Sequence, residues 1–137
     1  MPIPGSADDG TMVADVANFD LASEVAEVES SRPWPAGIYS KTLFKKTDFR
    51  TVLICMQAGT AIKEHHADGT SSVQVWKGAI RYKTLGQASE LKAGSLLTLG
   101  ASIKHEVEAI EDSAFLLTIS WPDNDELQAM RHRGYGT

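Results

Sequence analysis

The feature that most constrains this sequence is its rhythm of short β-forming runs separated by turn residues. From about residue 60 onward, turn residues recur every six to ten positions, and the runs between them cover 60–65, 71–77, 79–85, 88–92, 95–99, 103–110 and 113–121. Between Ile38 and Gln57, two more such runs are separated by Thr47 and Asp48. Short runs at this spacing, without long helical patterns between them, favour an antiparallel sandwich or barrel over a parallel sheet. The sequence therefore predicts an all-β body.

Short helices are expected at both ends of this body. Asp20 is a suitable N-cap for a helix in which Leu21, Val25 and Val28 recur at spacings of three and four. The prolines that follow end this helix near Ser31. We accordingly expect a flexible N-terminal arm over residues 1–18 and a single domain over 19–137. Within this domain, the barrel core covers about 36–121 and the C-terminal helix about 123–133.

Composition and charge exclude several classes of partner. The chain has 137 residues, of which 42% are hydrophobic and 23% charged, and this suits one domain with a sizeable core. Its net charge is −5 and its basic residues are dispersed, so we expect no nucleic-acid partner. No run approaches the roughly 18 apolar residues of a membrane helix, so we expect no membrane partner. The single cysteine, Cys55, allows no internal disulfide and favours a cytoplasmic location.

Two histidine-bearing segments frame the centre of the body. The first begins GTAIKEHH at Gly59 and brings in His65, and Gly78 follows it. The second, GSLLTLGASIKH, begins at Gly94 and ends at His105. These glycine and histidine spacings resemble the paired motifs of the cupin superfamily, specifically its small single-domain members.

The resemblance covers about residues 36–121 and implies an antiparallel double-stranded β-helix, or jelly-roll barrel. In cupins, three histidines and a glutamate hold a divalent metal, commonly iron, manganese, nickel or zinc. Only His65 and His105 carry over to this chain, because Ala67 stands at the position of the second histidine and Ser71 at that of the glutamate. The resemblance also implies a homodimer, since small cupins commonly pair through edge strands and arms.

Strand alternation turns the nearby substitutes for these ligands away from the interior. If His65 and His105 face inward, then the residues beside them, including His66 and the neighbouring carboxylates, face outward. A bulge at the HHADG turn would be needed to bring His66 inward. We therefore regard His65 and His105 as the candidate metal ligands and His66 as a weaker one.

Functions from different classes stay open at this level. The first is a small-molecule-binding cupin with an incomplete metal site, whose pocket is lined by His65, His105, Ser71 and Ala67 and whose specific activity is unknown. The second is a metal-dependent cupin enzyme of the dioxygenase or isomerase type, with His66 or an exogenous ligand completing a reduced histidine set. A third is a barrel that serves only as a structural or regulatory module. No catalytic residue is assigned.

Other reactive side chains have simpler interpretations. Cys55 lies in the apolar run TVLICMQ, which predicts a buried thiol without a basic neighbour. Arg81 and Tyr82 follow the turn at Gly78 and are expected at solvated strand positions, with the rim of a pocket as the alternative.

Overall fold

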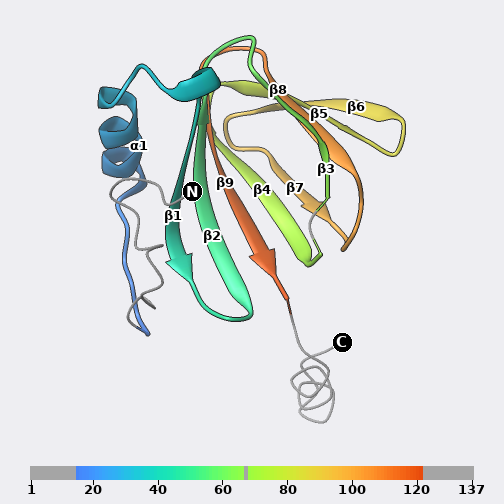
Figure 1. The fold of residues 1–137 in the computed structure, drawn as a ribbon, viewed down its shortest axis with the longest axis horizontal. Helices are drawn as coiled ribbons and strands as arrows, with labels where there is room; N and C mark the ends of the chain where they lie inside the picture. The colour runs from blue at the N-terminus through green and yellow to red at the C-terminus, as the bar shows by residue number, and fades with distance from the viewer. Residues whose placement is uncertain (1–14, 67, 122–137) are drawn as a thin grey trace.

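The barrel is built from two antiparallel sheets that face each other (Figure 1). The computed structural model describes residues 15–66 and 68–121, except for the side chain of His65. The five-stranded sheet has the order β1-β2-β9-β4-β7, with bounds Ile38–Lys45, Phe49–Met56, Ser113–Ser120, Thr70–Lys77 and Leu96–Leu99. The four-stranded sheet has the order β3-β8-β5-β6, with bounds Ala61–His65, His105–Ala109, Ala79–Thr84 and Gln87–Lys92.

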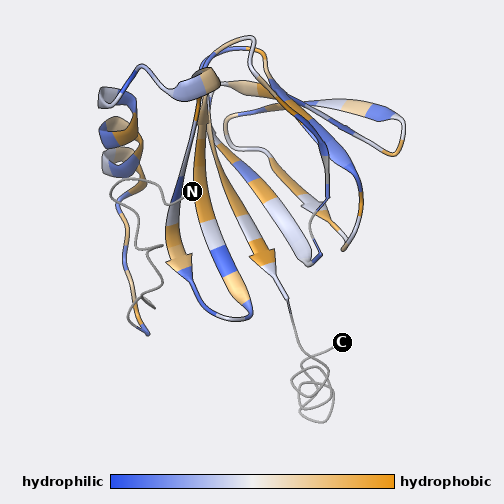
Figure 2. Cartoon of the chain, in the orientation of Figure 1, coloured by the Kyte–Doolittle hydropathy of each residue, from blue (hydrophilic) through white to orange (hydrophobic). Residues whose placement is uncertain are grey.

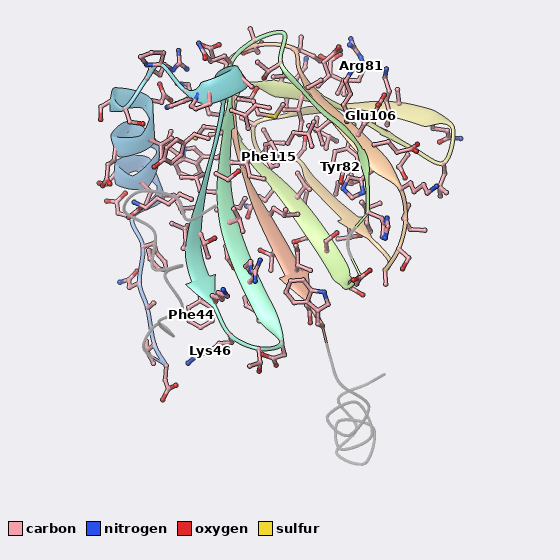
Figure 3. The ribbon with its side chains drawn as sticks, in the orientation of Figure 1. Phe44, Lys46, Arg81, Tyr82, Glu106 and Phe115 are labelled. Atoms are coloured by element: carbon pink, nitrogen blue, oxygen red, sulfur yellow. The ribbon has the colours of Figure 1, made fainter. Side chains whose placement is uncertain are left out.

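Alternation of side chains along the strands produces the interior of the barrel. In β4, Val73 and Val75 are buried, whereas Gln74 and Trp76 between and after them are exposed. The same alternation shows as orange and blue segments along the strands in Figure 2. The buried residues of both sheets meet in one apolar cluster, namely Ile54, Met56, Val73, Val75, Ile80, Tyr82, Leu99, Val107, Ala109 and Phe115. Figure 3 shows Tyr82 and Phe115 between the two sheets.

One helix covers the outer face of the five-stranded sheet. Helix α1, Leu21–Ser30, begins after Asp20, whose carboxylate accepts a hydrogen bond from the Ser23 amide at 3.2 Å. A short 3₁₀ turn, Pro35–Gly37, then leads into β1. Below α1 lies a second buried cluster, made of Val25, Val28, Trp34, Leu43, Leu53, Cys55 and Ala114. The helix lies beside β1 in Figure 1 and gives the five-stranded sheet a second buried face.

The observed elements confirm the β-rich body and the first helix. Each run expected between residues 38 and 121 is a strand, and the bounds differ from the expected ones by at most two residues. The C-terminal helix expected at 123–133 and most of the arm expected at 1–18 lie outside the described residues. No described helix is both long and apolar enough to cross a membrane.

Candidate functional site

The two histidine positions meet across β3 and β8. The Cα of His65 pairs with that of His105, and Ile62 pairs with Val107. Strict alternation from Ile62 would instead place Glu64 opposite His105, but the register shifts between Ile62 and His65. This irregularity adds one residue to β3, as a β-bulge does. It lies before His65, and not at the HHADG turn where a bulge would have been needed for His66.

His105 is held in the interior. Its side chain is 5% exposed, and Nδ1 lies 2.9 Å from the carbonyl oxygen of Ile103. Because a carbonyl oxygen only accepts, Nδ1 carries the hydrogen, and in the neutral ring Nε2 carries the lone pair. The ring stacks on that of Tyr82, with centroids 5.2 Å apart and planes at 17°. Tyr82 therefore helps to fix the orientation of the imidazole.

The expectation that Tyr82 occupies a solvated strand position is wrong. It is 2% exposed, and its burial raises the pKa of its hydroxyl. Tyr82 pairs with Val107 across β5 and β8, and cross-strand partners share one face of a sheet. The alternation of Ile80 and Tyr82 with the charged Arg81 could have revealed this burial. Arg81 lies at the outer margin of the molecule in Figure 3, as expected for a solvated position.

A second polar row faces inward from the five-stranded sheet. Ser71 is 5% exposed and belongs to the same face of β4 as Val73. Ser71 pairs with Ile119 of β9, and Ile119 pairs in turn with Arg50 of β2. Arg50 therefore shares the interior face with Ser71, two strands away.

Sequence reasoning missed Arg50. Its Nε is buried and has no hydrogen-bond partner among the described residues. Its guanidinium carbon lies 5.6 Å from the centre of the Trp121 ring. In the sequence, Arg50 alternates in step with the apolar Val52 and Ile54, and this spacing was the signal that the three residues share one face of the strand.

Both polar rows lie at the same end of the barrel. The chain connects His65 at the end of β3 to Thr70 at the start of β4 through residues 66–69 only. It likewise connects Leu99, the partner of Ser71, to His105 through residues 100–104. Short connections of this kind keep the joined strand ends close together. Figure 1 shows these strand ends on one side of the barrel.

The described side chains do not fit the metal centre of four ligands that cupins use. His66 is exposed, with Nε2 3.8 Å from Asp68 Oδ1. On β8, Glu106 lies 3.5 Å from the Lys83 ammonium, and Glu108 forms an ion pair with Arg81. Among the described residues, no three His, Cys, Asp or Glu side chains form a metal-binding group. Ala67 and the side chain of His65 lie outside the described part.

A cavity of about 690 Å³ lies beside these rows, at the β5–β6 hairpin and the loop before β8. Its lining includes Glu64, Thr84, Leu85, Ser102, Ile103 and Glu106. Of the described site residues expected from the sequence, His66, Ser71 and His105 are not part of this lining. Thr84 is nevertheless the Cα partner of His105, and Ile103 packs against the interior cluster. The cavity therefore adjoins the polar end of the barrel without entering it.

Several solved structures match this chain. A conserved protein of unknown function from Streptococcus pyogenes is 18% identical with a TM-score of 0.67, and the match covers 85% of this chain and 99% of that one. A cupin 2 conserved barrel domain protein from Leptotrichia buccalis is 28% identical with a TM-score of 0.61, covering 68% of this chain and 45% of that one. KdgF from a Halomonas species is 21% identical with a TM-score of 0.60, and the match covers 69% of this chain and 87% of that one.

Further matches are also cupins. No protein-family model matches the sequence, and no curated protein matches it. The likeness to these proteins is therefore a likeness of structure, carried by the two-sheet barrel described above. Both the resemblance seen in the histidine segments and the all-β jelly roll that it implied are confirmed. The chain has the fold of the cupin superfamily.

Proposed function

We propose that this protein binds a small molecule at the polar end of its barrel, between the row of His65 and His105 and the row of Ser71 and Arg50. The observation that carries this proposal is the burial of Ser71 and His105, each 5% exposed, at one end of the barrel beside the apolar cluster of the interior. A few convergent polar groups on an apolar wall are typical of small-molecule sites. On this proposal, His65, His105 and Ser71 anchor the ligand, and Ala67 contributes to the lining.

The first experiment is a titration with small carbonyl, phenolic and carboxylate compounds, followed by methyl NMR of the full chain. Binders are expected to shift the methyl signals of Val73 and Leu117, which belong to the interior, and to leave those of Leu43 and Leu53 under α1 in place. Two sets of methyl groups on opposite faces of one sheet thus report the location of the ligand.

Variants at two histidines test the anchor. His105→Ala is expected to weaken binding about fivefold or more, because a lost hydrogen bond costs about 1 kcal/mol. His66→Ala is the matched control, since this side chain is exposed, and it should leave affinity unchanged. Binders that are indifferent to His105→Ala, or that shift only the signals under α1, would place the site elsewhere.

A metal-dependent enzyme of the dioxygenase or isomerase type is the second candidate. The direct pairing of the His65 and His105 positions supports the enzyme. The carboxylates of Glu106 and Glu108 on β8 speak against it, because they point outward. Measurement of iron, manganese, nickel and zinc in the protein purified without a histidine tag separates the candidates. Stoichiometric metal that is lost in His105→Ala would favour the enzyme over the binding protein.

We further propose a homodimer in the cytoplasm. Four strands, β1, β7, β3 and β6, end the two sheets, and unpaired sheet edges are commonly covered by a partner. The buried, unpaired Cys55 is consistent with a reducing compartment. Light scattering of the full chain should give twice the mass of 14.8 kDa, and a monomer mass would contradict the dimer.

A further inference from the structure

We propose that the ligand of this barrel is a small carboxylate with an apolar body, and that Arg50 holds its carboxylate group. This inference rests on the proposed binding function and names the chemical class of the ligand. Its starting point is the register of β2, which pairs without interruption with β9 from Phe49 to Met56. Because no bulge intervenes, Arg50 lies on the same face as Val52 and Ile54, which belong to the interior.

The positive charge of Arg50 has no counterpart within the described residues. Arg50 forms no ion pair there, and its buried Nε has no hydrogen-bond partner. The cross-strand partner of Arg50 on β1 is Lys45, which is a second cation. On β8 of the facing sheet, Glu106 and Glu108 point outward and meet Lys83 and Arg81. Arg50 is half-buried, and a partly buried guanidinium without an anion is unfavourable, so a bound anion would stabilise it.

The geometry around Arg50 suits a planar carboxylate. A guanidinium presents parallel N–H donors that match the two oxygens of a carboxylate. The ring of Trp121, 5.6 Å from the guanidinium carbon, restricts the plane of this fork. A Cβ at Gly69 would collide with the Ser120 carbonyl and touch Trp121, so glycine allows the indole to lie here. Ser71 in the same row and His105 on the facing sheet offer further polar contacts.

The remainder of the ligand would meet an apolar surface. The row next to Arg50 on the interior face contains Val52, Leu117 and Val73, which pair across β2, β9 and β4. All three belong to or pack against the interior cluster. A single fork next to apolar side chains favours an organic monocarboxylate over inorganic phosphate, which has more acceptor oxygens to satisfy.

The test uses three matched probe pairs, isobutyrate, benzoate and 2-oxobutyrate, each with its neutral amide, and inorganic phosphate as a separate arm. Methyl NMR of the full chain is expected to show that at least one carboxylate shifts the signals of Val52 and Leu117, with an affinity at least about tenfold above that of its amide. Inorganic phosphate should not shift them. Failure of all three carboxylates, or equal binding of each acid and its amide, would overturn the carboxylate assignment, and so would tighter binding of phosphate.

Variants at Arg50 provide the second measurement. Arg50→Gln should lower carboxylate affinity at least about tenfold and leave amide affinity unchanged, and Arg50→Lys should lie between. Arg81→Gln, on the outer face beside Glu108, is the matched control and should change neither affinity. In addition, Arg50→Met should raise the melting temperature of the ligand-free protein and abolish the rise that the carboxylate produces, because it removes a half-buried cation that has no anion among the described residues. A lower melting temperature in Arg50→Met would contradict the unpaired cation.

The outcomes separate this inference from the function on which it rests. If amides or phenols bind in the interior and depend on His105, while Arg50→Gln has no effect, the carboxylate assignment fails and the binding function stands. If neither acids nor neutral probes shift the interior methyl signals, both fail.

Discussion

At the scale of single residues, Leu85 has the left-handed backbone conformation that glycine and asparagine adopt more easily than leucine. The Cα atoms of Thr84 and Gln87 are paired, so Leu85 and Gly86 form a two-residue hairpin loop. Both have positive φ, +52° and +76°, as a type I′ turn requires. Glycine adopts this conformation freely, whereas leucine does so at a cost of about 1–2 kcal/mol. The Leu85 side chain is also 79% exposed, so burial offsets little of this cost.

Leu85→Asn is therefore expected to stabilise the protein by about 1 kcal/mol, since asparagine tolerates the left-handed region. Urea unfolding of the variant and the wild type measures this difference. Leu96→Asn is the control, because Leu96 is also exposed, at 64%, but lies within β7 without a positive φ. A loss of stability in Leu85→Asn would show that the leucine side chain makes a contact that outweighs the strain.

At the scale of elements, α1 makes the five-stranded sheet buried on both faces. Leu53 of β2 is 1% exposed in the cluster beneath the helix. Trp34 reinforces the docking, because its indole N–H lies 3.2 Å from the Val28 carbonyl oxygen at the end of α1. Lys41 of β1 lies 2.7 Å from Glu24 and 3.3 Å from Glu27. Burial alone would lower the pKa of Lys41, but these two partners outweigh it and raise the pKa, so the ammonium stays charged at neutral pH.

Leu53→Ala should consequently lower the free energy of unfolding by about 2–5 kcal/mol, the usual cost of a large-to-small change in a packed core. Amide exchange in α1 should accelerate in the same variant, because the helix loses part of the surface on which it docks. Leu96→Ala, at an exposed site, should change stability by less than about 0.5 kcal/mol. Equal effects of the two substitutions would contradict the buried interface between α1 and the sheet.

At the scale of the whole molecule, the buried thiol couples global stability to high pH. Cys55 is 1% exposed, and its burial, followed by the negative charge of Glu29, raises the pKa of the thiol from 9.0 to about 11. A raised pKa means that the folded state favours the neutral thiol. This contribution to stability is complete below pH 9 and is lost as the pH rises through about 11.

Between these two pH values, the unfolding free energy of the wild type should fall more steeply than that of Cys55→Ala. The difference between the two curves isolates the thiol, because Tyr82, whose pKa is also raised, is present in both proteins. The buried thiol should also resist alkylation in the native state and react once the chain is unfolded in urea. Parallel stability curves, or rapid alkylation of the native protein, would contradict this coupling.

The sequence alone determined the elements and named every residue of the candidate site except Arg50. Turn residues and β-forming runs located the strands, and Asp20 with the apolar spacing after it located α1, because these signals are local in the chain. The glycine and histidine spacing indicated the cupin barrel and singled out His65 and His105, whose Cα atoms the structure pairs across β3 and β8. Local signals also predicted the buried Cys55.

Only the tertiary structure decided which side of β2 lines the barrel. Its residues Leu53 to Met56 are all buried, one face by the barrel interior and the other by α1, so no polar alternation in the sequence marks the inner face. Arg50 was assigned to the interior by its cross-strand pairing with Ile119, and Tyr82 by its pairing with Val107. Alternation in the sequence indicates that Tyr82 shares a face with Ile80 and Arg50 with Val52. Strand pairing with residues distant in the chain decided that these faces line the interior.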